Sequence, residues 1–341
     1  MLRKLRMEAT QRSIRDPLMV KLCSQMKRDV IILLGPTAVG KTSVGISLAK
    51  LVNFEILSAD SRLVYRGLDI GTAKPSIDER GGIPHHIIDI VNPDEEFTVA
   101  DWQDLAFKTI DEIHDRGKNC VVVGGTGLYI RALVDNPSWQ NLPPDPDLRD
   151  KILDDIETLG ADVVYKELVD FDPDAAGKIH PNNIPRLIRA VEVIRSTGKK
   201  FSDITESDSE RGNIPSKFNW RMFGLSMDRE LLYGRINRRV EAMIEAGWEK
   251  EVRRVLADGY TGDEKPLKGL GYRDMIRFVR DEIGLADAVE LIKRDTRRFA
   301  KRQMTYIRGL DGVKWINLEE NSDPDKVAEG ILTAIRESWT C

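Results

Sequence analysis

The segment GPTAVGKT at residues 35–42 constrains this chain more than any other, because it fits G-x-x-x-x-G-K-[ST] at every fixed position. An apolar run at Asp29–Leu34 precedes it, and a helical pattern at Lys41–Leu51 follows it. In such a strand–loop–helix unit the glycines let backbone N–H groups surround an anion, and the helix N-terminus adds its positive dipole end. The segment therefore predicts a phosphate-binding loop.

Within this loop, Lys41 would supply a positive charge, and the Thr42 hydroxyl would ligate Mg²⁺. The residues expected to surround the phosphates are Gly35, Thr37, Ala38, Val39, Gly40, Lys41 and Thr42. The motif predicts that an oligophosphate binds, but it does not identify the molecule that carries the phosphates.

A nucleotide hydrolase or kinase usually has a second acid at the end of an apolar strand, where it helps to hold the metal. The strand expected at Asn119–Val123 instead runs into Gly-Gly-Thr-Gly at 124–127, with no carboxylate. This absence weakens the ATPase interpretation and leaves room for a diphosphate that departs as a leaving group. Asp60 follows another predicted strand, and ligands bind at the carboxyl ends of parallel strands. A metal ligand, a general base and a helix cap remain open as roles for it.

Alternating strand and helix patterns predict the fold class. Strands are expected at Phe54–Leu57, Asn119–Val123, Arg221–Leu225 and Lys314–Leu318, and a helix at Ala100–Arg116. Together with the phosphate-binding loop, this pattern indicates an α/β fold with a P-loop NTPase-like parallel sheet flanked by helices.

Changes in composition predict the domain organisation. The segment Pro137–Asp147 is rich in proline, asparagine and aspartate and is typical of a boundary, and the pattern after it is helical. We therefore expect a catalytic core at 29–140 and 213–341, interrupted by a small helical insertion domain at 141–212. Residues 1–28 carry eight Lys or Arg against two acids, and we favour an inert extension over an RNA-binding tail.

Charge and cysteine content narrow the class of protein. The net charge of −4 argues against a uniformly basic nucleic-acid-binding coat, although a local basic face stays open. The three cysteines are far apart and fit no metal-ligand spacing, so we expect a reducing compartment. The longest apolar runs are too short to span a bilayer, and the N-terminus lacks the apolar core of a secretory signal. We expect a cytoplasmic monomer without membrane contact.

The chain resembles the tRNA dimethylallyltransferases, also called tRNA isopentenyltransferases, over about residues 29 to 320. The segments that carry the resemblance are GPTAVGKT at 35–42, SADSRLVYRGLDIGTAKP at 58–75, IPHHIIDI at 83–90, VVGGTGLYIRAL at 122–133, IHPNNIPRLIRAVEV at 179–193, RELLYGRINRRV at 229–240, GLGYRD at 269–274 and TRRFAKRQMTYIRG at 296–309.

The resemblance implies that N6 of the adenosine just 3′ of the tRNA anticodon displaces diphosphate from dimethylallyl diphosphate, with Mg²⁺ as cofactor. It implies that Asp60 is the general base and that Thr126 donates a hydrogen bond near the bridging oxygen. It also implies that Arg229 and Arg235 bind the diphosphate, with Arg235 counted among the catalytic residues. Six residues along a helix correspond to about 240°, so Arg229 would have to approach from the helix start.

The resemblance further implies contacts with the anticodon stem-loop of tRNA by the insertion and by two loops. The residues carried over are Asp60, Ser61, Arg62, Leu63, Pro185, Arg186, Arg189, Gly271, Tyr272 and Arg273. An independent pattern adds a helix over Asp287–Arg308, which we expect to begin with a capping box formed by Asp287 and Glu290. One face of this helix is apolar apart from Thr296 and Gln303, and the opposite face carries Arg294, Arg298 and Lys301 as candidate phosphate contacts.

Other interpretations remain open. An isopentenyltransferase acting on free AMP, ADP or ATP would share the phosphate-binding loop and Asp60, but it would need the insertion and the basic helix less. A P-loop kinase would need a metal-binding acid after a second strand, and a binding module would hold tRNA without turnover. For His85 and His86, in an expected turn after Pro84, we favour a structural role over a catalytic one.

Overall fold

The computed structural model describes residues 29–135, 142, 145–205 and 217–337. The basic segment 1–28 and most of the expected boundary at Pro137–Asp147 lie outside the described residues. The chain forms two compact units, one from residues up to Arg131 and from Lys217 onward, the other from Ala132 to Ser216. The insertion expected at 141–212 falls within the second unit.

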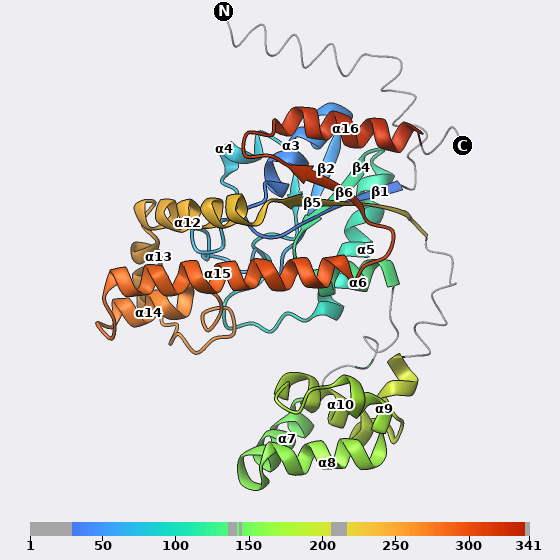
Figure 1. Cartoon of the computed structure of the whole chain (residues 1–341), viewed down its shortest axis with the longest axis vertical. Coiled ribbons are helices and arrows are strands. Elements are labelled where there is room, and N and C mark those ends of the chain that lie inside the picture. Colours follow the sequence, from blue (N-terminus) through green and yellow to red (C-terminus); the bar gives the residue numbers. More distant parts are fainter. Residues whose placement is uncertain (1–28, 136–141, 143–144, 206–216, 338–341) are drawn as a thin grey trace, which may run out of the picture. The chain divides into compact units, whose positions relative to one another are not determined.

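The first unit is built on a six-stranded sheet with the order β3-β2-β4-β1-β5-β6 (Figure 1). All neighbouring strands are parallel, which confirms the predicted fold class. The strands are β1 Asp29–Leu34, β2 Phe54–Ala59, β3 His85–His86, β4 Asn119–Gly124, β5 Asn219–Met227 and β6 Lys314–Leu318. Strand β1 is central and fully buried, so the phosphate-binding loop that follows it leaves from the middle of the sheet.

Helices cover both faces of this sheet. The helices that begin in this unit are α3 Lys41–Val52, α4 Ile77–Arg80, α5 Val99–Asp115, α6 Gly127–Asp135, α12 Arg229–Glu245, α13 Trp248–Ala257, α14 Tyr272–Val279, α15 Leu285–Arg308 and α16 Pro324–Glu337. One core joins α3 and α16 to alternate residues of β1, among them Ile31 and Leu33. Helix α5 packs on β2 and β4, and α15 packs on both α12 and α14.

Two local expectations were wrong. Helix α15 begins at Leu285 after an extended Gly284 that makes no side-chain cap, so Asp287 lies inside the first turn and no capping box forms with Glu290. His85 and His86 do not lie in a turn. They form the edge strand β3, in parallel register with Ile56 and Leu57 of β2. By contrast, Asp228 caps α12 as its position predicts.

The second unit is a cluster of helices, α7 Pro146–Leu159, α8 Ala161–Phe171, α9 Pro173–Lys178 and α10 Ile184–Thr197. Its core includes Leu168, Leu187 and Val191, all fully buried. The buried Glu192 carboxylate accepts hydrogen bonds from Arg149 (2.9 Å) and Arg189 (2.6 Å). No helix within the residues that the structure describes is long and apolar enough to cross a membrane.

Candidate active site

The phosphate-binding loop takes a conformation that its sequence permits. Gly35 and Gly40 have φ angles of +154° and +109°, in the region that disfavours side chains. At Gly35 a Cβ atom would also lie 2.8 Å from the Leu225 carbonyl oxygen. The Lys41 ammonium donates to the Pro36 carbonyl at 2.8 Å and so closes the loop on itself. Helix α3 starts at Lys41 without a side-chain cap, which leaves its first N–H groups available to an anion.

The second glycine turn lies directly beside Asp60. Strands β2 and β4 come so close that a Cβ on Gly124 would lie 2.1 Å from the Ala59 carbonyl oxygen. The Thr126 amide donates to that carbonyl (3.2 Å), and the Thr126 hydroxyl oxygen accepts from the Ser61 amide (3.1 Å). Thr126 is therefore hydrogen-bonded to Ala59 and Ser61, the residues on either side of Asp60.

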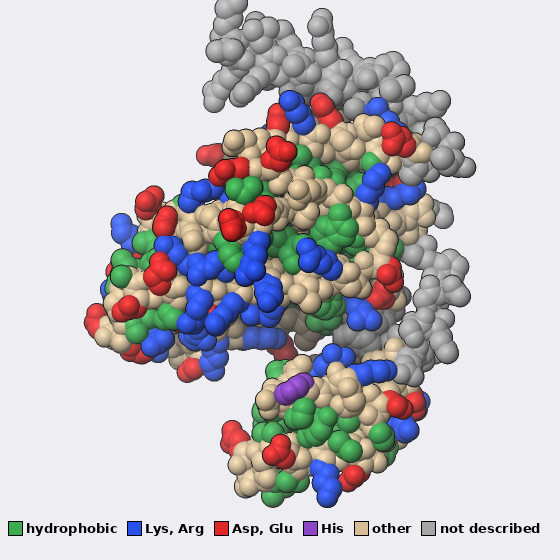
Figure 2. Space-filling model, viewed as in Figure 1, with side chains coloured by type: hydrophobic (Ala, Val, Ile, Leu, Met, Phe, Trp, Pro, Cys, Tyr) green, Lys and Arg blue, Asp and Glu red, His purple; other side chains and the backbone are tan. Residues whose placement is uncertain are grey.

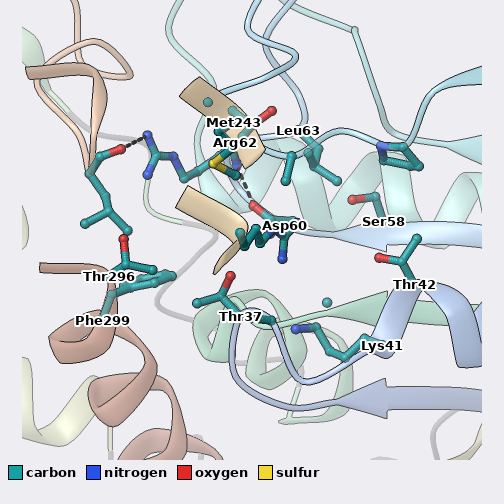
Figure 3. Close-up of a pocket in the computed structure, with 18 of the residues that line it drawn as sticks. Thr37, Lys41, Thr42, Ser58, Asp60, Arg62, Leu63, Met243, Thr296 and Phe299 are labelled. Carbon is teal, nitrogen blue, oxygen red and sulfur yellow. Dashed lines mark hydrogen bonds between the residues drawn. The ribbon is translucent and has the colours of Figure 1, made fainter. Parts of the chain in front are cut away.

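One cavity collects groups from the loop, from β2 and from two helices (Figure 3). Its predicted members are Thr37, Ala38, Lys41, Thr42, Asp60, Arg62 and Leu63. Helix α12 adds Arg239 and Met243, and α15 adds Thr296, Phe299 and Gln303. The Asp60 carboxylate accepts from the Arg62 amide at 3.0 Å, a local bond that fixes its direction. The cavity thus brings residues of the glycine-rich loop and a carboxylate together.

Burial lowers the pKa of Lys41 to about 8; the nearby Asp60 opposes this shift, and Arg239 adds to it. The free protein therefore carries a charged Lys41 below pH 8 and loses that charge as the pH rises through 8. A bound diphosphate favours the charged form. We expect the affinity for inorganic diphosphate to fall about tenfold per pH unit above pH 8. Calorimetric titration between pH 7 and 10 would measure this fall.

The matched control for this prediction is Lys41→Arg, because a guanidinium stays charged throughout that range. The variant should bind diphosphate more weakly at neutral pH, because the planar guanidinium group does not fit the loop. Its affinity for diphosphate should not fall above pH 8. If the diphosphate affinity of both proteins fell in the same way above pH 8, loss of the Lys41 charge would not be the cause of the fall.

Of the two arginines of α12 that the motif singles out, Arg235 lies beside the phosphate-binding loop and Arg229 does not. Arg235 donates to the Val39 carbonyl (3.2 Å) and the Glu320 carbonyl (3.0 Å), at the rim of the phosphate-binding loop. Arg229 lies at the exposed start of the helix, where its guanidinium stacks over the Tyr233 ring outside the cavity. Arg239 lines the cavity, although the motif does not single it out. Its spacing of four residues from Arg235 was the available signal, since such residues share a helix face.

Gln303 links the two glycine-rich turns. Its side-chain oxygen accepts from the Thr37 amide (2.8 Å), and its side-chain nitrogen donates to the Gly125 carbonyl (3.0 Å). The side chain is buried, so both bonds are sheltered from water. A polar residue on the inward face of α15 was the sequence signal for this role. Gln303 joins the helix that carries the basic face to the loop that binds phosphate.

Two expected RNA contacts need correction. Tyr272 is fully buried, and its hydroxyl donates to the Glu251 carboxylate at 2.6 Å. Gly271 is buried as well, and a Cβ there would lie 2.3 Å from the Trp248 ring. The same Glu251 carboxylate accepts from the amides of Asp69, Ile70 and Gly71. Gly271 and Tyr272 therefore shape the loop beside Arg62. The Tyr272 side chain and the Cα of Gly271 are both inaccessible to RNA.

The remaining expected contacts differ in exposure. Pro185 and Arg186 are exposed at the start of α10, whereas Arg189 is bound to Glu192 and to the Leu142 carbonyl. Arg273 is exposed and contacts Asp274 and Asp295, both at 3.4 Å.

Figure 2 shows Lys and Arg side chains gathered over α15. Of these, Arg294 and Arg298 contact Asp295, at 2.9 and 3.5 Å. Lys301, Arg302 and Arg308 are exposed and form no ion pair within the described residues. The exposed basic side chains of α15 that lack an acidic partner in the described residues therefore lie in the second half of the helix.

The fold and the cavity define a class of protein, a P-loop fold with a carboxylate beside the glycine-rich loop. The family model described as IPP transferase matches residues 63–310. The chain belongs to the IPP transferase family.

Relatives and solved structures agree with this family. The chain is 45% identical over 303 residues to a tRNA dimethylallyltransferase of Acetivibrio thermocellus, covering 89% of this chain and 96% of the relative. A tRNA isopentenylpyrophosphate transferase structure from Bacillus halodurans has a TM-score of 0.67 at 40% identity, covering 91% of this chain and 96% of that one. A eukaryotic dimethylallyltransferase described as acting on tRNA has a TM-score of 0.74 at 30% identity, covering 92% of this chain and 79% of that one.

Proposed function

We propose that the protein transfers the dimethylallyl group from dimethylallyl diphosphate to N6 of the adenosine 3′-adjacent to the anticodon in tRNA, and that diphosphate is released. The relatives named tRNA dimethylallyltransferase support this reaction. The observation that carries it is the single cavity that holds both the phosphate-binding loop and Asp60. The loop would hold the leaving diphosphate and Asp60 would accept the proton from the nucleophile, so both must face the same reacting groups.

The chemistry follows from the charges around the cavity. As N6 attacks the allylic carbon, the carbon–oxygen bond breaks and negative charge accumulates on the departing diphosphate. The N–H groups of the loop, Lys41 and Arg239 are fixed around that charge before the reaction begins. Asp60 accepts the N6 proton, and the Thr126 hydroxyl, held by Ser61, is proposed to donate toward the bridging oxygen. Mg²⁺, when bound at the Thr42 hydroxyl, would neutralise part of the diphosphate charge.

The acceptor decides between this proposal and its nearest rival. Purified protein would be incubated with labelled dimethylallyl diphosphate and either tRNA or AMP, ADP and ATP. We expect label on tRNA alone, because a free nucleotide makes no use of the basic face of α15. Label on the free nucleotides alone would overturn the proposal. Tight tRNA binding without any transfer would indicate a binding module.

A second expectation concerns the basic face. Lys301→Glu should weaken tRNA binding more than Arg294→Glu does, because Asp295 already neutralises part of the Arg294 charge. For each RNA phosphate that the variant no longer neutralises, the slope of log affinity against log salt should fall by about 0.7 to 0.9. Filter binding at several salt concentrations measures both quantities. Lys326→Glu, at an exposed position of α16, is the matched control, and equal losses in all three variants would leave the α15 face without a specific role.

A further inference from the structure

Three polar side-chain atoms at the cavity wall are buried without a hydrogen-bond partner in the described residues: Ser58 Oγ, His85 Nε2 and Trp248 Nε1. Such atoms are rare in folded proteins, and each one requires an explanation. For Trp248 Nε1 the explanation is steric. A Cβ on Gly71 would lie 2.3 Å from this nitrogen, so Gly71 leaves no room for a ligand there. Ser58 and His85 remain, and neither is used by the reaction described above.

The contacts of His85 define what its free nitrogen needs. Its Nδ1 lies 2.8 Å from the Ile83 carbonyl oxygen, which can only accept, so Nδ1 carries the proton. Burial lowers the pKa of His85, and its ring is therefore neutral at physiological pH. Nε2 is then a bare acceptor directed at the cavity wall, and it requires a hydrogen-bond donor.

The sheet places Ser58 and His85 on the same side. His85 pairs in register with Ile56, and Ser58 follows Ile56 by two residues on β2, so the three side chains share one face. Ile56 packs in the core that includes α3, the helix whose first turn contains Thr42. Figure 3 shows the Ser58 and Thr42 side chains next to each other at the cavity. The unpartnered atoms therefore lie on the side of the cavity where Thr42 would ligate a metal.

The proposed substrates offer few donors at this place. Diphosphate oxygens accept hydrogen bonds, the dimethylallyl chain has no polar hydrogen, and the N6 proton goes to Asp60. Water bound to a divalent cation is a strong donor. Mg²⁺ keeps several of its waters and is usually held by one or two protein ligands together with substrate phosphates.

We propose that Ser58 and His85 form an outer-shell site that accepts hydrogen bonds from the water ligands of a hydrated divalent cation, bound between Thr42 and the diphosphate. The inference rests on the proposed function only in taking diphosphate as the ligand of the loop. Outer-shell partners of this kind orient the inner ligands of a metal and strengthen its binding.

The first arm of the test measures metal binding without RNA or a prenyl chain. Mn²⁺ is titrated into protein saturated with inorganic diphosphate, and the bound ion is followed by electron paramagnetic resonance. Ser58→Ala and His85→Phe should each weaken Mn²⁺ binding about tenfold. Ser58→Thr keeps the hydroxyl and should retain wild-type affinity. The control is His86→Phe, because His86 lies on the opposite face of β3 and pairs with Glu55 at 2.7 Å; it should bind Mn²⁺ normally.

Unchanged Mn²⁺ affinity in folded Ser58→Ala and His85→Phe, with folding checked by thermal unfolding, would overturn the proposal. A second arm compares dimethylallyl diphosphate with an analogue that carries a hydroxyl on its chain. If the two variants lost affinity only for the hydroxylated analogue, the donor would be the chain and the metal assignment would be wrong. Because neither arm contains tRNA, a failed acceptor assay would overturn the proposed function without changing these results.

Discussion

Replacing Asp60 by asparagine should slow prenyl transfer about 10²- to 10⁴-fold, the usual contribution of a positioned general base. The asparagine oxygen can still accept from the Arg62 amide, as the Asp60 carboxylate does at 3.0 Å. The substitution therefore keeps the local geometry and removes only the basicity. Single-turnover transfer to tRNA would measure the rate, and filter binding the RNA affinity.

RNA affinity should stay close to the wild-type value in this variant, because the carboxylate is proposed to act on one proton of a base that is already bound. Asp60→Ala should lose transfer at least as completely. The control is Asp78→Asn, a neutralised carboxylate at an exposed position on α4. Transfer at near the wild-type rate in Asp60→Asn would leave Asp60 as a structural cap on the turn that follows β2.

Replacing Arg239 by glutamine should lower kcat by about 10²- to 10³-fold, as expected when one preorganised donor to a developing charge is removed. Burial lowers the pKa of the Arg239 guanidinium, and the neighbouring Asp60 opposes that shift, so the charge is held inside the cavity near the reacting groups. A partly buried charge interacts more strongly with the diphosphate than a fully solvated surface charge does.

The sequence offers a matched control at the preceding position. Arg238 is exposed and contacts the Glu320 carboxylate at 3.1 Å, so Arg238→Gln removes the same charge from the surface of the same helix. It should leave kcat nearly unchanged. A loss confined to KM in Arg239→Gln would show that this arginine binds substrate and transition state equally. Equal effects in the two variants would remove Arg239 from the catalytic site.

The sequence alone predicts the elements that depend on local patterns. Strands β1 and β6 have the predicted bounds, and the phosphate-binding loop joins β1 to α3. Asp60 lies where parallel topology puts a residue after a strand, at the carboxyl edge of the sheet. These predictions succeed because strand runs, glycine turns and helix caps are determined by neighbouring residues.

The errors share one physical cause. Tyr272 looks like a loop aromatic in the sequence, yet Trp248 and Glu251, more than 20 residues earlier, bury its ring and bind its hydroxyl. His85 follows a proline, yet pairing with Ile56 makes it part of a strand. In each case a partner distant in the sequence decides the environment of the side chain.

The sequence by itself predicted a phosphate-binding loop after β1 and an acid, Asp60, after β2, because both depend on backbone geometry that a few adjacent residues set. Only the tertiary structure decided which arginine reaches the cavity, how Gln303 ties the basic helix to the phosphate-binding loop, and which polar atoms are left without partners. Those outcomes depend on how α12, α15 and β3 pack against the loop. Packing is set by contacts between residues as much as 266 positions apart, which no local pattern contains.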